Sequence, residues 1–195
     1  KKKKKGKLHG QERDMSAIFG RVSFDSQSIA RDSFDVAFST LDVWGKDGRT
    51  VLHKENASFG HQKLALKASE VEDVQLFEQD GLCILADAVI DNRGDLSERL
   101  DIPSERRVSD CQLILFAFLR WGEECAQYLV GDFAFAIWNI HSGEFFAARD
   151  IAGARPFFYS KYGSQFLFST TVEAIANTPD IDFDIDESRV VFFFF

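Results

Sequence analysis

The side chains that could do chemistry in this chain are few and widely spaced. The histidines lack the spacing of metal ligands, and each cysteine lies in an apolar stretch far from the other two. These residues are His9, His53, His61 and His141, and Cys83, Cys111 and Cys125. An odd number of scattered cysteines is typical of reduced, buried thiols rather than of a disulfide framework. We therefore expect no metal site, and we expect His61 to be packed or hydrogen-bonded.

One charged pair, Arg149-Asp150, and one Arg-Pro pair, Arg155-Pro156, stand out in the second half of the chain. Arg149-Asp150 is predicted to tie the loop that follows it through charge-assisted hydrogen bonds, with a catalytic role as the alternative. Arg155-Pro156 is predicted to set the start of the next strand. The sequence contains no glycine-rich phosphate-binding motif of either common type.

Arg149-Asp150 and Arg155-Pro156 lie within residues 131–159, the stretch around which the chain is organised. From 132 to 138 the residues alternate at period two, and both faces are apolar: Phe133, Phe135 and Ile137 on one, Ala134, Ala136 and Trp138 on the other. A turn at 139–143 and a strand at 144–149 complete an antiparallel hairpin. Antiparallel sheets usually leave one face exposed to solvent, so a hairpin that is apolar on both faces requires a layer of structure on each side.

The remaining pattern predicts an alternation of short strands and helices. Strands are expected at 17–23, 50–53, 57–65, 75–78, 82–87, 156–159 and 165–169, and helices at 34–43, 94–100, 111–121 and 171–176. Asp80-Gly81 is a hairpin signal, and residues 161–164 are expected to form a second turn. Ser109 is a good N-cap, and Gly122 is expected to end the helix that precedes it. That helix is apolar almost all round, which predicts burial on all sides.

Composition limits the class of protein. The chain has 195 residues, enough for one domain with a sizeable core, and its 21 Phe residues favour a thick core. Six of the 23 Lys and Arg residues lie in the first seven positions, so 17 basic side chains face 31 acidic ones in the rest. An acidic surface disfavours nucleic acid and anionic lipid, and no apolar run approaches the length of a membrane helix. A cytoplasmic protein with neither nucleic-acid nor membrane partners is expected.

The two ends of the chain differ from its middle. Residues 1–14 are polar and lack periodicity, so they are expected to be a disordered extension or tag, with a polybasic binding arm as the alternative. Residues 186–195 are expected to begin a further helix.

Several motifs occur in an order that resembles the N-terminal domain of asparagine-synthetase-like proteins. They are Met15-Ser16-Ala17-Ile18-Phe19-Gly20, Trp44-Gly45-Lys46-Asp47-Gly48, Gly60-His61-Gln62-Lys63-Leu64, Ala86-Asp87-Ala88-Val89-Ile90-Asp91-Asn92-Arg93, Ser109-Asp110, and Gly131 to Trp138 followed by Arg149-Asp150 and Arg155-Pro156. The resemblance covers Met15 to about Arg189 and is strongest to the branch that includes lasso-peptide macrolactam synthetases. It implies an α+β fold, a four-layer αββα sandwich of two antiparallel sheets as in N-terminal-nucleophile (Ntn) hydrolases, with a class II glutamine amidotransferase-like domain at 15–195.

The resemblance also implies a site, which this sequence changes. Active members begin with a Cys after the initiator Met, and the freed amine serves as base for the thiol. Ser16 stands at that position, and fourteen residues precede Met15. The family's carboxylate-binding Arg is matched by Lys63, a point charge instead of a bidentate clamp.

Further changes affect the position where the family stabilises an oxyanion. Asp87-Ala88 replaces its Asn-Gly pair, and Val89 replaces a Glu. Loss of one oxyanion donor costs about 2.7–4 kcal/mol, and an ionised Asp about 4 Å away would repel the anion by about 4 kcal/mol at an intermediate dielectric constant. Only Asp110 matches the family's residue for the substrate amino group, and a role beside the helix N-cap is the alternative.

These changes predict a degenerate domain that does not hydrolyse glutamine. The parent would be an ATP-dependent amide ligase of the lasso-peptide cyclase type, which adenylates a carboxylate for attack by an amine. ATP and Mg would belong to a C-terminal ATP-pyrophosphatase-type synthetase domain, with no cofactor in this domain, and a precursor peptide would be a further partner. The alternatives are an active glutaminase supplying ammonia for asparagine synthesis, with a processed Ser16 as nucleophile, and a stand-alone protein-binding module.

Overall fold

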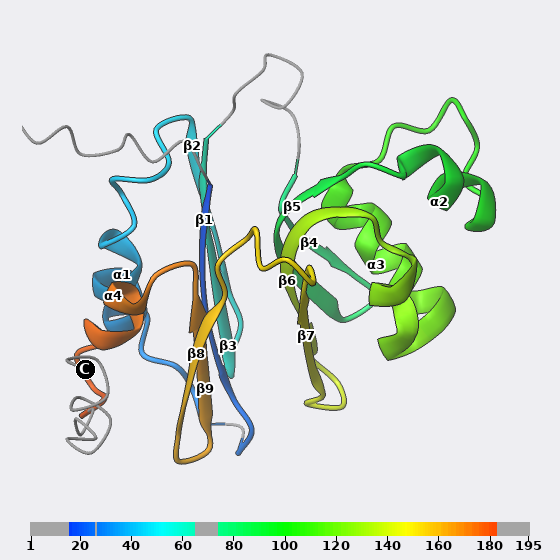
Figure 1. The fold of residues 1–195 in the computed structure, drawn as a ribbon. Coiled ribbons are helices and arrows are strands. Elements are labelled where there is room, and N and C mark those ends of the chain that lie inside the picture. Colours follow the sequence, from blue (N-terminus) through cyan, green and yellow to red (C-terminus); the bar gives the residue numbers. More distant parts are fainter. Residues whose placement is uncertain (1–15, 26, 65–73, 183–195) are drawn as a thin grey trace, which may run out of the picture.

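The computed structural model of the chain describes residues 16–25, 27–64 and 74–182. Two antiparallel sheets face each other, and helices cover the outer face of each (Figure 1). This arrangement confirms the expected α+β sandwich of two antiparallel sheets. The predictions for residues 1–14 and for a helix from residue 186 lie outside the described residues.

One sheet has five strands and the other has four. The five-stranded sheet runs in the order β2 (Gly48–His53), β3 (Ala57–Lys63), β1 (Ala17–Ser23), β9 (Gln165–Ser169) and β8 (Phe158–Tyr162). The four-stranded sheet runs in the order β4 (Leu76–Gln79), β5 (Leu82–Ile90), β6 (Gly131–Asn139) and β7 (Phe145–Arg149). Every neighbouring pair of strands is antiparallel, which allows short hairpins between strands that follow each other in the chain.

The helices form the two outer layers. The five-stranded sheet is covered by α1 (Arg31–Ser39) and α4 (Val172–Ala176); on the other side of the molecule lie α2 (Arg93–Arg99), α3 (Asp110–Trp121) and the 3₁₀ helix η2 (Gly122–Tyr128). The Ser109 cap of α3 is confirmed: its hydroxyl accepts from Gln112 N, and the Gln112 side chain accepts from Ser109 N. This capping box satisfies two main-chain donors at the start of the helix.

Both faces of β6 are buried, as its apolar alternation predicted. Phe133, Phe135 and Ile137 pack in one core cluster with α3, whereas Ala136 and Trp138 pack in another cluster between the sheets. The three cysteines are buried and free, as expected. Burial raises the pKa of Cys83 to about 12 and that of Cys125 to about 11, so these two thiols stay protonated at neutral pH.

Several element boundaries and one burial prediction were wrong. Helix α1 begins at Arg31, three residues before the predicted start at residue 34. The sequence did not indicate this start, because the N-cap Ala30 has no side-chain capping group. Strand β8 continues to Tyr162, so its turn is shorter than predicted, and β5 runs on to Ile90. Helix α3 is not buried all round: Leu119 is 53% exposed, since the helix meets the sheet along one face only.

A buried arginine joins β1 to the helical layer, and the sequence pattern did not predict it. Arg21 is 1% exposed and makes two hydrogen bonds to the Asp180 carboxylate, of 2.9 and 2.6 Å. Its Nε donates to Gln165 at 2.7 Å and its Nη1 to Ser33 at 3.1 Å. The guanidinium holds the pKa of Asp180 down at about 2. A buried charge is tolerated here because its donors are paired.

The gap between the sheets is filled by aromatic rings, and one glycine makes room for them. A Cβ placed on Gly20 would lie 2.1 Å from Cζ of Phe168. The Phe168 ring is held in place by neighbouring rings, among them Phe59, Phe145 and Phe157, at centroid distances of 6.2, 5.6 and 5.2 Å. The ring therefore has little freedom to move away from an added methyl group.

We predict that Gly20→Ala lowers the free energy of unfolding by about 3 kcal/mol, because overpacking a filled core forces strain. Chemical denaturation measures the change. In the Phe168→Leu background the same substitution should cost clearly less, since the clashing ring is gone. Gly94→Ala is the matched control: no atom lies within 4 Å of its added Cβ, and α2 should tolerate or gain from alanine. Equal effects of the two alanines would contradict this account of the core.

Candidate functional site

Ser16 lies at one end of the gap between the sheets. It precedes β1 and shares the strand parity of Ile18 and Val22, whose side chains pack in the inter-sheet cluster. Its Oγ accepts from Leu64 N at 3.1 Å and donates to Leu64 O at 3.4 Å. Within the described residues, these main-chain groups are its hydrogen-bond partners, and no histidine or carboxylate forms a hydrogen bond with it. The hydroxyl therefore acts here as a structural tie between β1 and the end of β3.

The connection between β7 and β8 lies at this same end. Phe158, the first residue of β8, is opposite Ser169, and Ser169 is opposite Phe19 in β1. The connection therefore carries Arg155 to the end of the sandwich at which Ser16 precedes β1. The start of β1 and the end of β5 also lie at this end of the molecule, each in its own sheet (Figure 1).

Asp87 on β5 points into the gap from the four-stranded sheet. It is 5% exposed, its Oδ1 lies 3.4 Å from Nη1 of Arg155, and its Oδ2 has no hydrogen-bond partner among the described residues. Burial raises the pKa of Asp87 to about 6, with Arg155 opposing the rise and Asp132 adding to it. The carboxylate is thus mostly ionised at neutral pH, and Arg155 offsets part of its charge. The sequence pattern had given Arg155 only a backbone role.

His61 on β3 enters the gap from the opposite sheet. It is 2% exposed, and its Nε2 has no hydrogen-bond partner among the described residues. Burial, together with the charge of Lys63, lowers the pKa of His61 to about 4. The imidazole is therefore neutral at physiological pH. The prediction of a packed histidine is confirmed, and the orphaned nitrogen is a feature that the sequence did not reveal.

The other predicted site residues lie in different surroundings. Lys63 ends β3 on the gap-facing parity and is partly buried. Ala88 faces the opposite way, into the cluster with α3. Asp110 accepts from Ile90 N at 3.2 Å and forms an ion pair with Arg93. Its carboxylate ties β5 to the start of two helices, which is the structural alternative named above. The functional roles of Ser16, Lys63, Asp87, Ala88 and Asp110 stay predictions.

Asp150 organises the connection that carries Arg155. Its carboxylate accepts from Ala154 N at 2.9 Å and from Arg155 N and Phe133 N, both at 3.3 Å. Burial alone would raise the pKa of Asp150, but these main-chain donors and that of Gly153 hold it below its ordinary value. The prediction that the pair ties the loop is thus confirmed for Asp150. Arg149, in contrast, is exposed.

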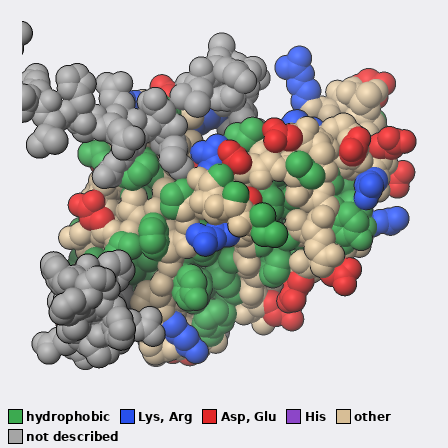
Figure 2. All heavy atoms as spheres, in the orientation of Figure 1, with side chains coloured by type: hydrophobic (Ala, Val, Ile, Leu, Met, Phe, Trp, Pro, Cys, Tyr) green, Lys and Arg blue, Asp and Glu red, His purple; other side chains and the backbone are tan. Residues whose placement is uncertain are grey.

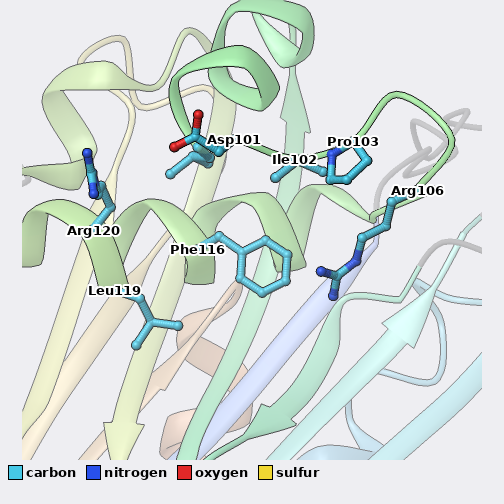
Figure 3. Close-up of a pocket in the computed structure, with 8 residues that line it drawn as sticks. Asp101, Ile102, Pro103, Arg106, Phe116, Leu119 and Arg120 are labelled. Atoms are coloured by element: carbon cyan, nitrogen blue, oxygen red, sulfur yellow. The ribbon is translucent and has the colours of Figure 1, made fainter.

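A second candidate site is a groove of about 330 Å³ on the outer side of α3 (Figure 3). It is lined by Leu100, Asp101, Ile102, Pro103, Arg106, Phe116, Leu119 and Arg120. The Arg106 guanidinium lies over the Phe116 ring, 5.1 Å from its centroid. Neither a thiol nor an imidazole lines the groove. Its chemistry suits binding of an apolar group and not covalent catalysis.

The described residues contain no group of three or more His, Cys, Asp or Glu that could hold a metal ion. A separate finding concerns membranes: none of the helices in the described ranges has the length and apolar character needed to span a bilayer.

Comparison with solved structures identifies the class of fold. Glutamine phosphoribosylpyrophosphate amidotransferase from B. subtilis, in a complex with ADP and GMP, superposes with a TM-score of 0.67 over 83% of this chain and 43% of its own. The identity is only 18%, so the likeness concerns the fold, which is that of the Ntn amidotransferases.

Sequence comparison identifies the family. Residues 15–195 match the glutamine amidotransferase domain, and the chain belongs to this family. Asparagine synthetase [glutamine-hydrolyzing] 3 of Bacillus subtilis (strain 168) is 33% identical over 180 residues, which are 89% of this chain and 29% of that protein. Asparagine synthetase [glutamine-hydrolyzing] 2 of Oryza sativa subsp. japonica is 27% identical over 84% of this chain and 28% of its own length. The chain thus spans less than a third of these relatives.

We predict that Asp87→Asn flattens the pH dependence of stability. Because burial raises the pKa of Asp87 from 3.8 to about 6, the folded state binds a proton more tightly than the unfolded state. The wild type should lose stability as pH rises from 4 to 6, by about 2–3 kcal/mol relative to the variant. Urea unfolding at a series of pH values measures this difference. The exposed Asp95→Asn is the control, and a D87N curve parallel to that of the wild type would contradict the prediction.

Proposed function

We propose that this domain is a degenerate, non-hydrolytic glutamine amidotransferase domain of an asparagine-synthetase-like, ATP-dependent amide ligase. The observation that carries the proposal is the state of Ser16: its hydroxyl is hydrogen-bonded to the main chain of Leu64, and no side-chain base is hydrogen-bonded to it within the described residues. Serine needs such a base to act as a nucleophile near neutral pH.

The electrostatics of the gap support the same proposal. A glutaminase must stabilise an oxyanion, yet a buried carboxylate, Asp87, stands at the position expected for a donor. Its charge is only partly offset by Arg155 at 3.4 Å. His61 is neutral near pH 7, because its pKa is lowered to about 4, so it adds no positive charge at the gap.

For the whole protein we propose a ligase of the lasso-peptide cyclase type. The support is the sequence Ala86-Asp87-Ala88-Val89-Ile90-Asp91-Asn92-Arg93 and the pair Met15-Ser16, which resemble that branch. A C-terminal ATP-pyrophosphatase-type domain would be the partner, with ATP and Mg²⁺ supplying carboxylate activation there. The domain spanning 15–195 would then pack on that partner and shape the access of a precursor peptide, in the cytoplasm.

A second candidate is an active glutaminase that supplies ammonia. It is favoured by the relatives, whose names describe them as glutamine-hydrolyzing. In this candidate, cleavage before Ser16 would free an amine to serve as the base. The two candidates differ in one measurable activity, the release of ammonia from glutamine.

We predict that the purified protein releases no ammonia from glutamine above background, because Ser16 lacks a base and Asp87 opposes an oxyanion. Ser16→Ala should leave this background unchanged. A chain beginning at residue 16 that carries Ser16→Cys, Lys63→Arg, Asp87→Asn and Ala88→Gly should release glutamate at least about 100-fold faster, since nucleophile, clamp and oxyanion donor are all restored.

Matched controls separate the two proposals. The same truncated chain with Ser16→Cys alone should stay near background, because the pocket still carries Asp87. Ammonia release by the wild type that disappears in Ser16→Ala would refute the proposal of a non-hydrolytic domain and establish glutaminase activity. Mass spectrometry of the purified protein shows whether any fraction of the chain begins at Ser16.

A further inference from the structure

Strand β8 is an open edge of the five-stranded sheet. It pairs with β9 on one side, and no strand in the described parts of the chain pairs with its other side. Such an edge presents unpaired main-chain donors and acceptors. Its aromatic residues are unusually exposed: Phe158 by 45%, Tyr159 by 69% and Tyr162 by 44%. Figure 2 shows hydrophobic side chains gathered on the face that carries this strand.

Hairpin geometry identifies which main-chain groups point outward. Strands β8 and β9 are joined by the two residues Gly163 and Ser164, so Tyr162 and Gln165 form the closing pair. The closing pair of a two-residue hairpin exchanges both of its hydrogen bonds, and such pairs alternate along the ladder. The main-chain groups of Ser160 therefore face β9, whereas those of Tyr159 and Lys161 point away from the sheet.

We propose that β8 pairs antiparallel with β8 of a second copy of this chain, about a two-fold axis at Ser160. This register pairs all five residues of the strand and places Tyr159 opposite Lys161 of the second copy. The outward main-chain groups of these two residues then bond each other, on both sides of the axis. Phe158 lies opposite Tyr162 of the second copy, which gives two aromatic cross-strand pairs.

Charge selects this register among the two-fold alternatives. Lys161 is the one charged residue of β8. A pairing centred on Lys161 would place two ammonium groups directly opposite each other, which is destabilising. A pairing centred on Tyr159 would shift β8 out of full overlap and bring Phe157, next to Pro156, into the ladder. At the Ser160 centre each ammonium instead meets a tyrosine ring, a favourable cation–π arrangement.

The first test is the mass of the protein in solution as a function of its concentration. Sedimentation velocity should show a shift from 22.1 kDa toward twice that mass, with a dissociation constant on the order of tens of micromolar, because a single strand pair makes a small interface. Lys161→Pro should abolish the dimer, since it removes an outward N–H. The monomer should keep its fold, as proline is tolerated at such edge positions.

Lys161→Ala is the matched control, because it keeps the N–H and should dimerise more weakly than the wild type but measurably. Thermal unfolding of both variants confirms that the monomer is intact. A wild-type mass that stays at 22.1 kDa at all concentrations overturns the proposal, whatever else binds the edge. A dimer that persists undiminished in Lys161→Pro also overturns it.

The second test fixes the register. Residues at a non-hydrogen-bonded two-fold centre have Cα atoms about 4.5 Å apart, within the range of a disulfide. Ser160→Cys should therefore give a disulfide-linked dimer under mild oxidation, which non-reducing electrophoresis detects. Leu119→Cys, 53% exposed on α3, is the control and should stay monomeric. Equal cross-linking of both variants, or a dimer in which Ser160→Cys fails to cross-link, contradicts the register.

Discussion

The structure depends on the closure of the gap between two sheets by apolar and aromatic side chains. Both faces of each sheet are covered, so a polar group that points into the gap loses its hydration. This constraint explains why Gly20 lies under the Phe168 ring, and why the polar residues of the gap lie toward its end. At that end, the polar side chains must find hydrogen-bond or ion-pair partners within the protein to replace water.

Three charged residues at that end depend on one another in turn. Asp150 holds the backbone of its loop, the loop positions Arg155, and Arg155 offsets the charge of Asp87. From the sequence alone, Asp87 is expected to be an unopposed anion beside an oxyanion. In the structure, Arg155 lies 3.4 Å from its carboxylate, so the repulsion is weaker than that expectation. The stronger support for the proposed lack of glutaminase activity is therefore the nucleophile: the Ser16 hydroxyl is hydrogen-bonded to the main chain of Leu64, which cannot act as its base.

The sequence predicted the layers well, and the pairs of charged side chains poorly. The apolar alternation along β6 and the Ser109 cap are local patterns, and each led to the observed element. The start of α1 was missed because Ala30 carries no capping signal. Arg155 and Asp87 are 68 positions apart, and Arg21 and Asp180 are 159 apart, so no spacing rule joins them. Long-range ion pairs depend on the packing of whole sheets, which local periodicity does not describe.

The separation between scaffold and site also limits what family membership implies. The core clusters that hold the sheets together contain neither Ser16 nor Asp87 nor Lys63. Substitutions at those positions can remove a catalytic activity while the rings and strands of the core keep the fold. Two proteins can therefore share the fold and the domain family and still differ in the reaction that they catalyse. The chemistry of this chain accordingly depends on the hydrogen bonds and charges at the end of its inter-sheet gap.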